Sequence, residues 1–192
     1  MSLETTPEDT RYVPFVQQPY CCVPTCLQMV AYKNDLPLLP QEYIGAKLGL
    51  VVPPEDEKYF YNVAVSEEPP VASGYGTRIQ DPDFSLENFL VEERWPLKLV
   101  KKLASTLTSK TVLLEQLSQV ESAYGDVLIC LQNDRGYGHV VVFDRLIDGD
   151  VRIIDPSPLH PKWRTLPLND VYTRIQNHGD DNFGGLWHLS QS

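Results

Sequence analysis

The chain has 192 residues, of which 42% are hydrophobic and 22% are charged, a balance that excludes a disordered chain, a collagen-like fibre and a coiled coil. Its 26 acidic side chains exceed its 16 basic ones, and a formal net charge of -10 repels phosphate, so we expect no nucleic-acid partner. No apolar run of the sequence reaches the roughly 18–20 residues of a membrane span, and we expect no such span.

We expect one domain over residues 1–192, because two full domains would be crowded in a chain of this length. Residues 1–16 form a lead-in segment whose polar, acidic start lacks the apolar core of a signal peptide, so we expect a cytoplasmic protein unless a non-classical secretion route applies. Prolines, glycines and charged residues dominate residues 51–82, which we interpret as a long loop insertion that shapes a substrate groove or covers it.

Helical patterns fill the first part of the chain. Cys26, Leu27, Val30 and Ala31 form one apolar stripe, which predicts a helix that begins at Pro24 and ends near residue 34 or 35. Proline suits the first helical position because the N–H group that it lacks would have no partner there. Three further helices are predicted at residues 40–48, 85–95 and 111–124. Residues 97–108 stay unassigned.

The second part of the chain changes to strand patterns. Residues 126–131 form a continuous apolar run, which is typical of a strand buried on both faces. Further strands are predicted at 139–147, 150–155 and 185–190, with a short helix at 168–176. Helices followed by antiparallel strands predict an α+β fold rather than alternating β-α-β units.

Three cysteines stand at the start of the first predicted helix. A cysteine just before a helix lies at the positive end of the helix dipole, near unpaired N–H groups, and both favour the nucleophilic thiolate. Cys22, two residues before Pro24, is better placed for this role than Cys21. A glutamine shortly upstream can offer its amide to an oxyanion together with a backbone N–H, and Gln17 and Gln18 both qualify.

A thiolate nucleophile also needs a base and a group that orients the base. His139 begins a predicted strand, and Asp155 ends the next one. A two-residue turn at Asp148 and Gly149 would put the two side chains on opposite faces of the sheet, whereas a three-residue loop ending at Gly149 would put them on the same face. Because a Cys–His–Asp group needs them together, we predict the three-residue loop.

These motifs resemble the papain-like bacteriocin-processing (double-glycine-type) cysteine peptidases and their soluble relatives. The matching stretches are Gln17, Cys22-Val23-Pro24-Thr25 with Met29, Gly138-His139 before three valines, and Ile154-Asp155-Pro156. The resemblance implies a papain-like fold, in which an N-terminal helical part with the cysteine helix packs on a C-terminal antiparallel sheet. It also implies Cys22 as nucleophile, His139 as general base, Asp155 as its orienting group and Gln17 as oxyanion donor.

The activity that the resemblance implies is hydrolysis of peptide or amide bonds in a peptide or protein substrate, without a cofactor. Two alternatives use the same fold. One is an inactive peptide-binding module, marked by Val23 where the family usually has glycine, and the other is a glutamine deamidase or transamidase-type effector. The cysteines contain no CxxC pair, so we expect no metal site. Cys26 and Cys130 are interpreted as small buried hydrophobic residues.

Overall fold

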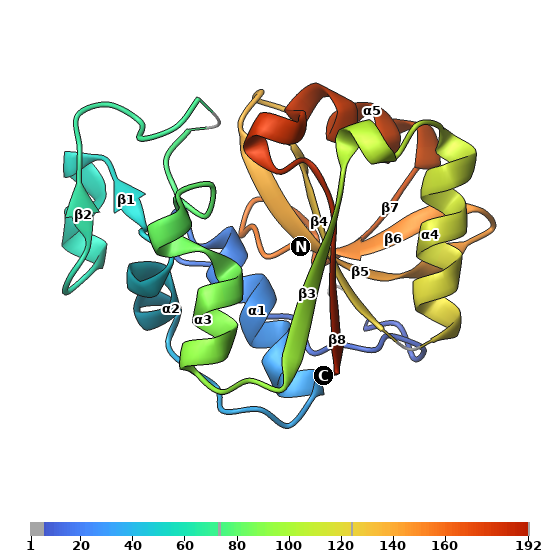
Figure 1. The fold of residues 1–192 in the computed structure, drawn as a ribbon, viewed down its shortest axis with the longest axis horizontal. Coiled ribbons are helices and arrows are strands. Elements are labelled where there is room, and N and C mark those ends of the chain that lie inside the picture. Colours follow the sequence, from blue (N-terminus) through green and yellow to red (C-terminus); the bar gives the residue numbers. More distant parts are fainter. Residues whose placement is uncertain (1–5, 73, 124, 192) are drawn as a thin grey trace.

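Figure 1 shows the computed structural model of the chain, which describes residues 6–72, 74–123 and 125–191. The start of the predicted lead-in, residues 1–5, and the last residue of the predicted helix 111–124 lie outside the described residues. The described helices are α1 (Cys22–Lys33), α2 (Gln41–Lys47), α3 (Leu86–Glu92), α4 (Lys110–Ser122) and α5 (Leu168–His178). None of these described helices combines the length and the apolar character that crossing a membrane requires.

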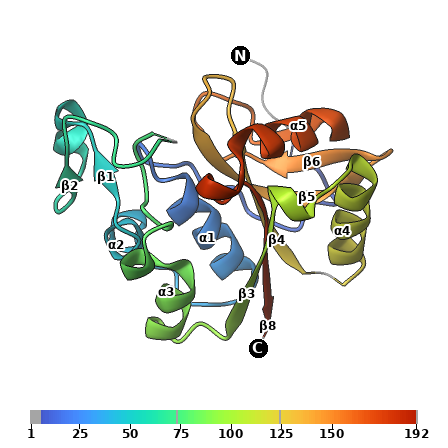
Figure 2. The ribbon, with the colours of Figure 1, turned by 45° about the horizontal axis from the view of Figure 1, so that its top comes forward.

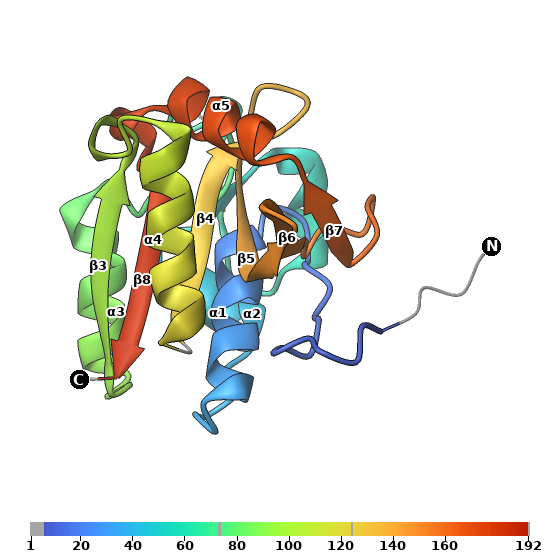
Figure 3. The same ribbon diagram turned by 90° about the vertical axis from the view of Figure 1, so that its right-hand side faces the viewer.

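A six-stranded antiparallel sheet runs through the molecule in the order β3-β8-β4-β5-β6-β7, and Figure 3 shows this order across the sheet. Its strands are β3 (Leu97–Leu103), β4 (Asp126–Gln132), β5 (Gly138–Ile147), β6 (Asp150–Ile154), β7 (Trp163–Leu166) and β8 (Gly185–Gln191). Strands β4, β5 and β6 are the predicted antiparallel run. The C-terminal strand β8 returns to lie between β3 and β4.

Both faces of the sheet are covered by helices, as Figure 2 shows. Because successive side chains of a strand point to opposite faces, Val140 and Val142 of β5 pack into the cluster that contains α1, while Val141 and Phe143 pack into the cluster that contains α4 and α5. The Cys26 thiol of α1 also donates a hydrogen bond to the Val140 carbonyl, at 3.3 Å. The cysteine helix is therefore fixed directly against the strand that carries His139.

Helix α1 begins two residues earlier than predicted. Its first residue is Cys22 and its N-cap is Cys21, so Pro24 is the third helical residue rather than the first. Proline is tolerated there because the first four N–H groups of a helix have no intrahelical acceptor. Cys22 therefore belongs to the first turn of the helix and does not merely precede it.

Two strands of the sheet escaped prediction, and both are edge strands. Strand β3 contains three lysines among its seven residues, and lysine is typical of exposed edges, where it discourages pairing with another chain. Those lysines interrupt the apolar alternation that would have revealed the strand. Strand β7 has four residues, and only its pairing with β6 distinguishes it from the preceding loop.

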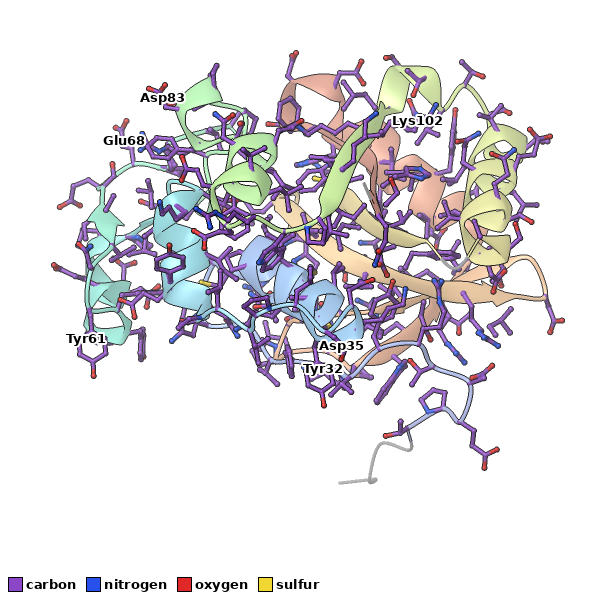
Figure 4. The ribbon with its side chains drawn as sticks, turned by 60° about the horizontal axis from the view of Figure 1, so that its bottom comes forward. Tyr32, Asp35, Tyr61, Glu68, Asp83 and Lys102 are labelled. Carbon is purple, nitrogen blue, oxygen red and sulfur yellow. The ribbon has the colours of Figure 1, made fainter. Side chains whose placement is uncertain are left out.

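The predicted insertion contains a small substructure. Strands β1 (Val51–Val52) and β2 (Ala64–Val65) pair in parallel, with a short 3-10 helix at Pro54–Tyr59 between them. The rest of the described part of residues 51–82 is mostly irregular. Figure 4 shows Tyr61 and Glu68 pointing outward from this part of the molecule.

The hairpin between β5 and β6 differs from the predicted three-residue loop. Ile147 pairs with Asp150, and both Asp148 and Gly149 have positive φ angles, so the turn is the two-residue form. The register then shifts by one residue at Asp144, where a β-bulge lies between Phe143 and Arg145. Beyond the bulge, Val142 pairs with Ile154, which brings His139 and Asp155 to the same face. The predicted loop was wrong, and the bulge achieves the register that it was expected to provide.

The described part of the lead-in, residues 6–16, is attached to this bulge. The Asp144 carboxylate is fully buried and accepts hydrogen bonds from the Arg11 N–H, at 3.0 Å, and the Thr10 hydroxyl, at 3.2 Å. Arg152 on β6 donates to the same carboxylate through its Nε, at 2.7 Å. The bulged residue therefore connects the lead-in to the central hairpin.

Candidate active site

The structure brings His139 and Asp155 into direct contact. The His139 Nε2 lies 2.8 Å from Asp155 Oδ1, with 13% of the histidine side chain exposed and none of the aspartate. A carboxylate can only accept hydrogen bonds, so Nε2 carries the proton and the other ring nitrogen, Nδ1, is left for a second partner. The Cys22 thiol interacts with the same ring, and this interaction shifts the pKa values of both groups.

The contacts of Cys22 favour the thiolate. Burial raises the pKa of the thiol, but the hydrogen bond and charge of His139, together with the N–H groups of Val23 and Val140, outweigh burial and hold the pKa below its ordinary value. The Val23 N–H belongs to the first turn of α1 and has no acceptor within the helix. The helix terminus therefore contributes to the lowered pKa of the thiol.

The pKa values of His139 and Asp155 are both shifted in the direction that favours the charged forms. Burial lowers the pKa of His139, but its hydrogen bonds to Asp155 and Cys22 outweigh burial and raise the pKa well above its ordinary value. Burial raises the pKa of Asp155, but the contacts with His139, the Ser157 N–H and Arg164 lower it to about 2. The three groups can therefore form a thiolate, an imidazolium and a carboxylate in sequence.

Two partners of Asp155 were not predicted. The Ser157 N–H donates to Oδ1 at 2.9 Å, and Arg164 of β7 donates through Nη1 to Oδ2 at 3.0 Å. The Ser157 contact is a local turn in which an aspartate accepts from the N–H two residues later, and the Asp-Pro-Ser sequence could have indicated it. The Arg164 contact depends on the unpredicted pairing of β6 with β7, so it left no local signal in the sequence.

Gln17 lies beside this group. Its backbone N–H donates to the Pro156 carbonyl at 2.9 Å, which ties it to the residue after Asp155, and it lines the same cavity as Cys22 and His139. The backbone N–H of Gln18 donates to Gln41 Oε1 of α2 at 2.7 Å, and neither cavity beside Cys22 is lined by Gln18. The placement favours Gln17 over Gln18 as a neighbour of the thiol.

Cys22 and His139 line a cavity of about 810 Å³ and also a smaller one of about 40 Å³. The two cavities share Cys22 and His139 as well as Gly74 and Tyr75 of the insertion. The Tyr75 ring lies 5.7 Å from that of Tyr20. Residues of the 51–82 segment therefore line both cavities that Cys22 lines.

The remaining cysteines and Val23 face the protein interior. Cys21 is fully buried in a cluster with Leu50 and Val52, and burial raises its pKa. Cys26 and Cys130 are also buried, in the core between α1 and the sheet. Val23 is 4% exposed and packs in the same core, so its side chain adds little to the accessible surface beside the thiol. In the described part of the chain, no three His, Cys, Asp or Glu side chains gather as metal ligands.

Comparison with known proteins identifies the fold. Neither a protein-family model nor a curated protein sequence matches the chain. The structure is similar to solved structures, among them the crystal structure of a "putative C39-like peptidase" from Bacillus anthracis. That match has a TM-score of 0.56 and 19% sequence identity and covers 94% of this chain and 95% of the other. The chain therefore has the fold of a C39-like peptidase, which confirms the predicted papain-like α+β class.

Proposed function

We propose that the chain is a cysteine peptidase that hydrolyses peptide or amide bonds with Cys22 as nucleophile, His139 as acid and base, Asp155 as orienting group and Gln17 as oxyanion donor. The contact series from the Cys22 thiol through the His139 ring to the buried Asp155 carboxylate carries this proposal. The fold similarity to a C39-like peptidase supports it. Cys–His pairs oriented by a third group are the recurring arrangement of thiol-dependent acyl transfer.

The first half of the reaction forms an acyl-enzyme. The Cys22 thiolate attacks the substrate carbonyl carbon, and the carbonyl oxygen becomes an oxyanion. The Cys22 N–H, which has no acceptor within the helix, and the Gln17 side-chain amide would donate hydrogen bonds to that oxyanion. The His139 imidazolium then gives its proton to the leaving amine as the carbon–nitrogen bond breaks.

The second half releases the acid. His139, now neutral, takes a proton from water, which attacks the thioester and forms a second oxyanion in the same position. Collapse of this intermediate expels the Cys22 thiolate and leaves the imidazolium that began the cycle. Asp155 keeps the ring in one tautomer throughout because Nε2 stays bound to its carboxylate.

Cys22 and His139 line both cavities, and two cavities that share these residues suit an extended substrate. A chain laid across Cys22 would occupy the larger cavity with one flank of the scissile bond and meet the narrow one with the other. Tyr75 of the insertion borders both cavities, so the insertion would contact the substrate on each side of the bond. This arrangement favours a peptide or protein over a small molecule as substrate.

Labelling with a cysteine-reactive acyl probe tests the nucleophile. We expect one modified residue, Cys22, and loss of labelling in C22A. The adjacent and buried Cys21 provides the matched control, because C21A should keep both the labelling and the activity. Labelling that survives C22A would contradict the proposal.

Incubation with peptide pools, followed by mass spectrometry, separates the proposed peptidase from the alternatives. New chain ends that depend on Cys22 support peptide hydrolysis. Conversion of glutamine to glutamate in intact peptides would instead support a deamidase. Peptides that bind without either change would support an inactive binding module.

A further inference from the structure

We propose that Arg164 is a positioning residue that acts through Asp155 and sets the pH range over which the Cys22–His139 ion pair exists. The inference rests on the proposed function. Arg164 lies on β7, outside the motifs that suggested the site, and its Nη1 donates to Asp155 Oδ2 at 3.0 Å. Arg164 therefore adds a fourth group to Cys22, His139 and Asp155.

Each oxygen of the Asp155 carboxylate has a different kind of partner. Oδ1 accepts from the His139 ring and from the Ser157 N–H, whereas Oδ2 accepts from the Arg164 guanidinium. The carboxylate is fully buried, and a buried charge needs a compensating charge to be tolerated. The guanidinium supplies that charge whether His139 is protonated or neutral.

The charged and titratable groups around Asp155 come from three elements. Cys26 of α1 lies within the electrostatic reach of Asp155, while His139 of β5 and Arg164 of β7 hydrogen-bond to it. Further along the cavity wall, Asp134 interacts electrostatically with Arg174, Arg164 and His160, and these interactions lower its pKa. Arg164 forms an ion pair with Asp155, whereas Arg174 forms one with Asp134.

The sign of the effect follows from the charge that Arg164 neutralises. Without the guanidinium, more of the Asp155 negative charge acts on His139 and Cys22. This charge stabilises the imidazolium and opposes formation of a second anion, the thiolate. The pKa values of His139 and Cys22 should therefore both rise, and the whole pH profile should move upward. Loss of a merely structural residue would lower the height of the profile without moving it.

The rate of Cys22 alkylation by iodoacetamide, measured against pH in the full chain, tests this without a known substrate. Wild type should show a lower inflection, where the thiolate forms, and an upper one, where the imidazolium loses its proton. In R164Q both inflections should move upward by about 0.5–1 pH unit. In R164K they should stay near their wild-type positions because the charge is kept, although an ammonium cannot reproduce the guanidinium geometry.

Arg174 offers a matched control in the same cavity. Its side chain is 27% exposed, against 24% for Arg164, but it pairs with Asp134 instead of Asp155. R174Q should leave both inflections in place. Unmoved inflections in a folded R164Q, or an equal movement in R174Q, would overturn the inference. A wild-type thiol that titrates as an ordinary cysteine would instead overturn the proposed function.

A measurement on the unaltered protein covers the case in which R164Q does not fold. In ¹⁵N nuclear magnetic resonance spectra, the guanidinium signals of Arg164 should shift at the pH where His139 loses its proton, since both groups share the Asp155 carboxylate. The Arg174 signals should not shift there. Arg164 signals that stay constant through that pH would contradict the inference.

Discussion

At the scale of single residues, a displacement of one position decides which cysteine is activated. Cys21 is the N-cap of α1 and is packed among apolar side chains, where burial raises its pKa. Cys22 is the next residue, and contact with His139 lowers its pKa despite burial. The same helix terminus therefore holds one thiol with a raised pKa and one with a lowered pKa, and the second is the nucleophile that we propose.

The first residue-scale prediction concerns Gln17. If its amide donates to the oxyanion, Q17A should lower kcat by roughly 100-fold and change KM little, because the contact forms only in the transition state. The variant keeps the backbone hydrogen bond between Gln17 and Pro156, so the local chain path should persist. Steady-state kinetics on a peptide identified in the pool experiment provide the measurement.

Gln18 supplies the comparison for Q17A. Gln18 does not line either cavity beside Cys22, so the Q18A variant should keep kcat close to that of wild type. A larger loss of kcat in Q18A than in Q17A would assign the oxyanion contact to Gln18, against the placement in the cavity.

At the scale of elements, the β5–β6 hairpin shows which structural features could be predicted from the sequence and which could not. The sequence of β5 indicates a buried strand, and the need for His139 and Asp155 to share a face gives the correct final register. The sequence pattern does not reveal that this register is provided by a bulge rather than by the turn. Asp144 is the residue that could have indicated the bulge, because a charged side chain inside an apolar strand needs special partners.

The unpredicted parts of the site have a common cause. Cys22, His139 and Asp155 each stand in a local motif, so their types and order could be interpreted along the chain. Arg164 reaches Asp155 only because β7 pairs with β6, and that pairing arises from distant packing rather than from the four residues of the strand. Contacts made by short edge strands are therefore the part of the site that sequence patterns omit.

The element-scale prediction is that D144A weakens the hairpin. Removing the carboxylate leaves the Arg152 guanidinium without its buried partner and releases Arg11 and Thr10 of the lead-in. Loss of one member of a buried ion pair should lower the free energy of unfolding by about 3 kcal/mol, measured by urea denaturation. An exposed acidic residue gives the control, and D181A should change that free energy by less than about 0.5 kcal/mol. A D144A variant as stable as D181A would show that the bulge does not depend on its carboxylate.

At the scale of the whole molecule, ionisable groups within the fold act in opposite directions on stability. A lowered Cys22 pKa stabilises the fold as pH rises toward the ordinary pKa of a thiol, while a raised His139 pKa removes stability over much of the same range. The two contributions oppose each other above the ordinary pKa of histidine. Below that value His139 is protonated in both the folded and the unfolded chain, so it adds no pH dependence.

Two other histidines should then contribute most of the pH dependence of the free energy of unfolding between pH 7 and pH 5. Burial lowers the pKa of His178 in α5, and burial together with the charge of Lys102 lowers the pKa of His188 in β8. The unfolded chain binds more protons than the folded one in this range, so the stabilisation is present above the ordinary histidine pKa and is lost as pH falls below it. The free energy of unfolding should fall by on the order of 1 kcal/mol between pH 7 and pH 5.

Urea denaturation of wild type and variants at several pH values measures the slope of the free energy of unfolding against pH. The double variant H178Q/H188Q should lose most of it, whereas H160Q, which changes a loop histidine beside the cavity, should keep it. Because the comparison is between slopes, a uniform loss of stability in the double variant does not obscure the result. A slope that persists in the double variant would place the pH sensitivity elsewhere in the chain, whereas its loss would assign that sensitivity to the packing of α5 and β8.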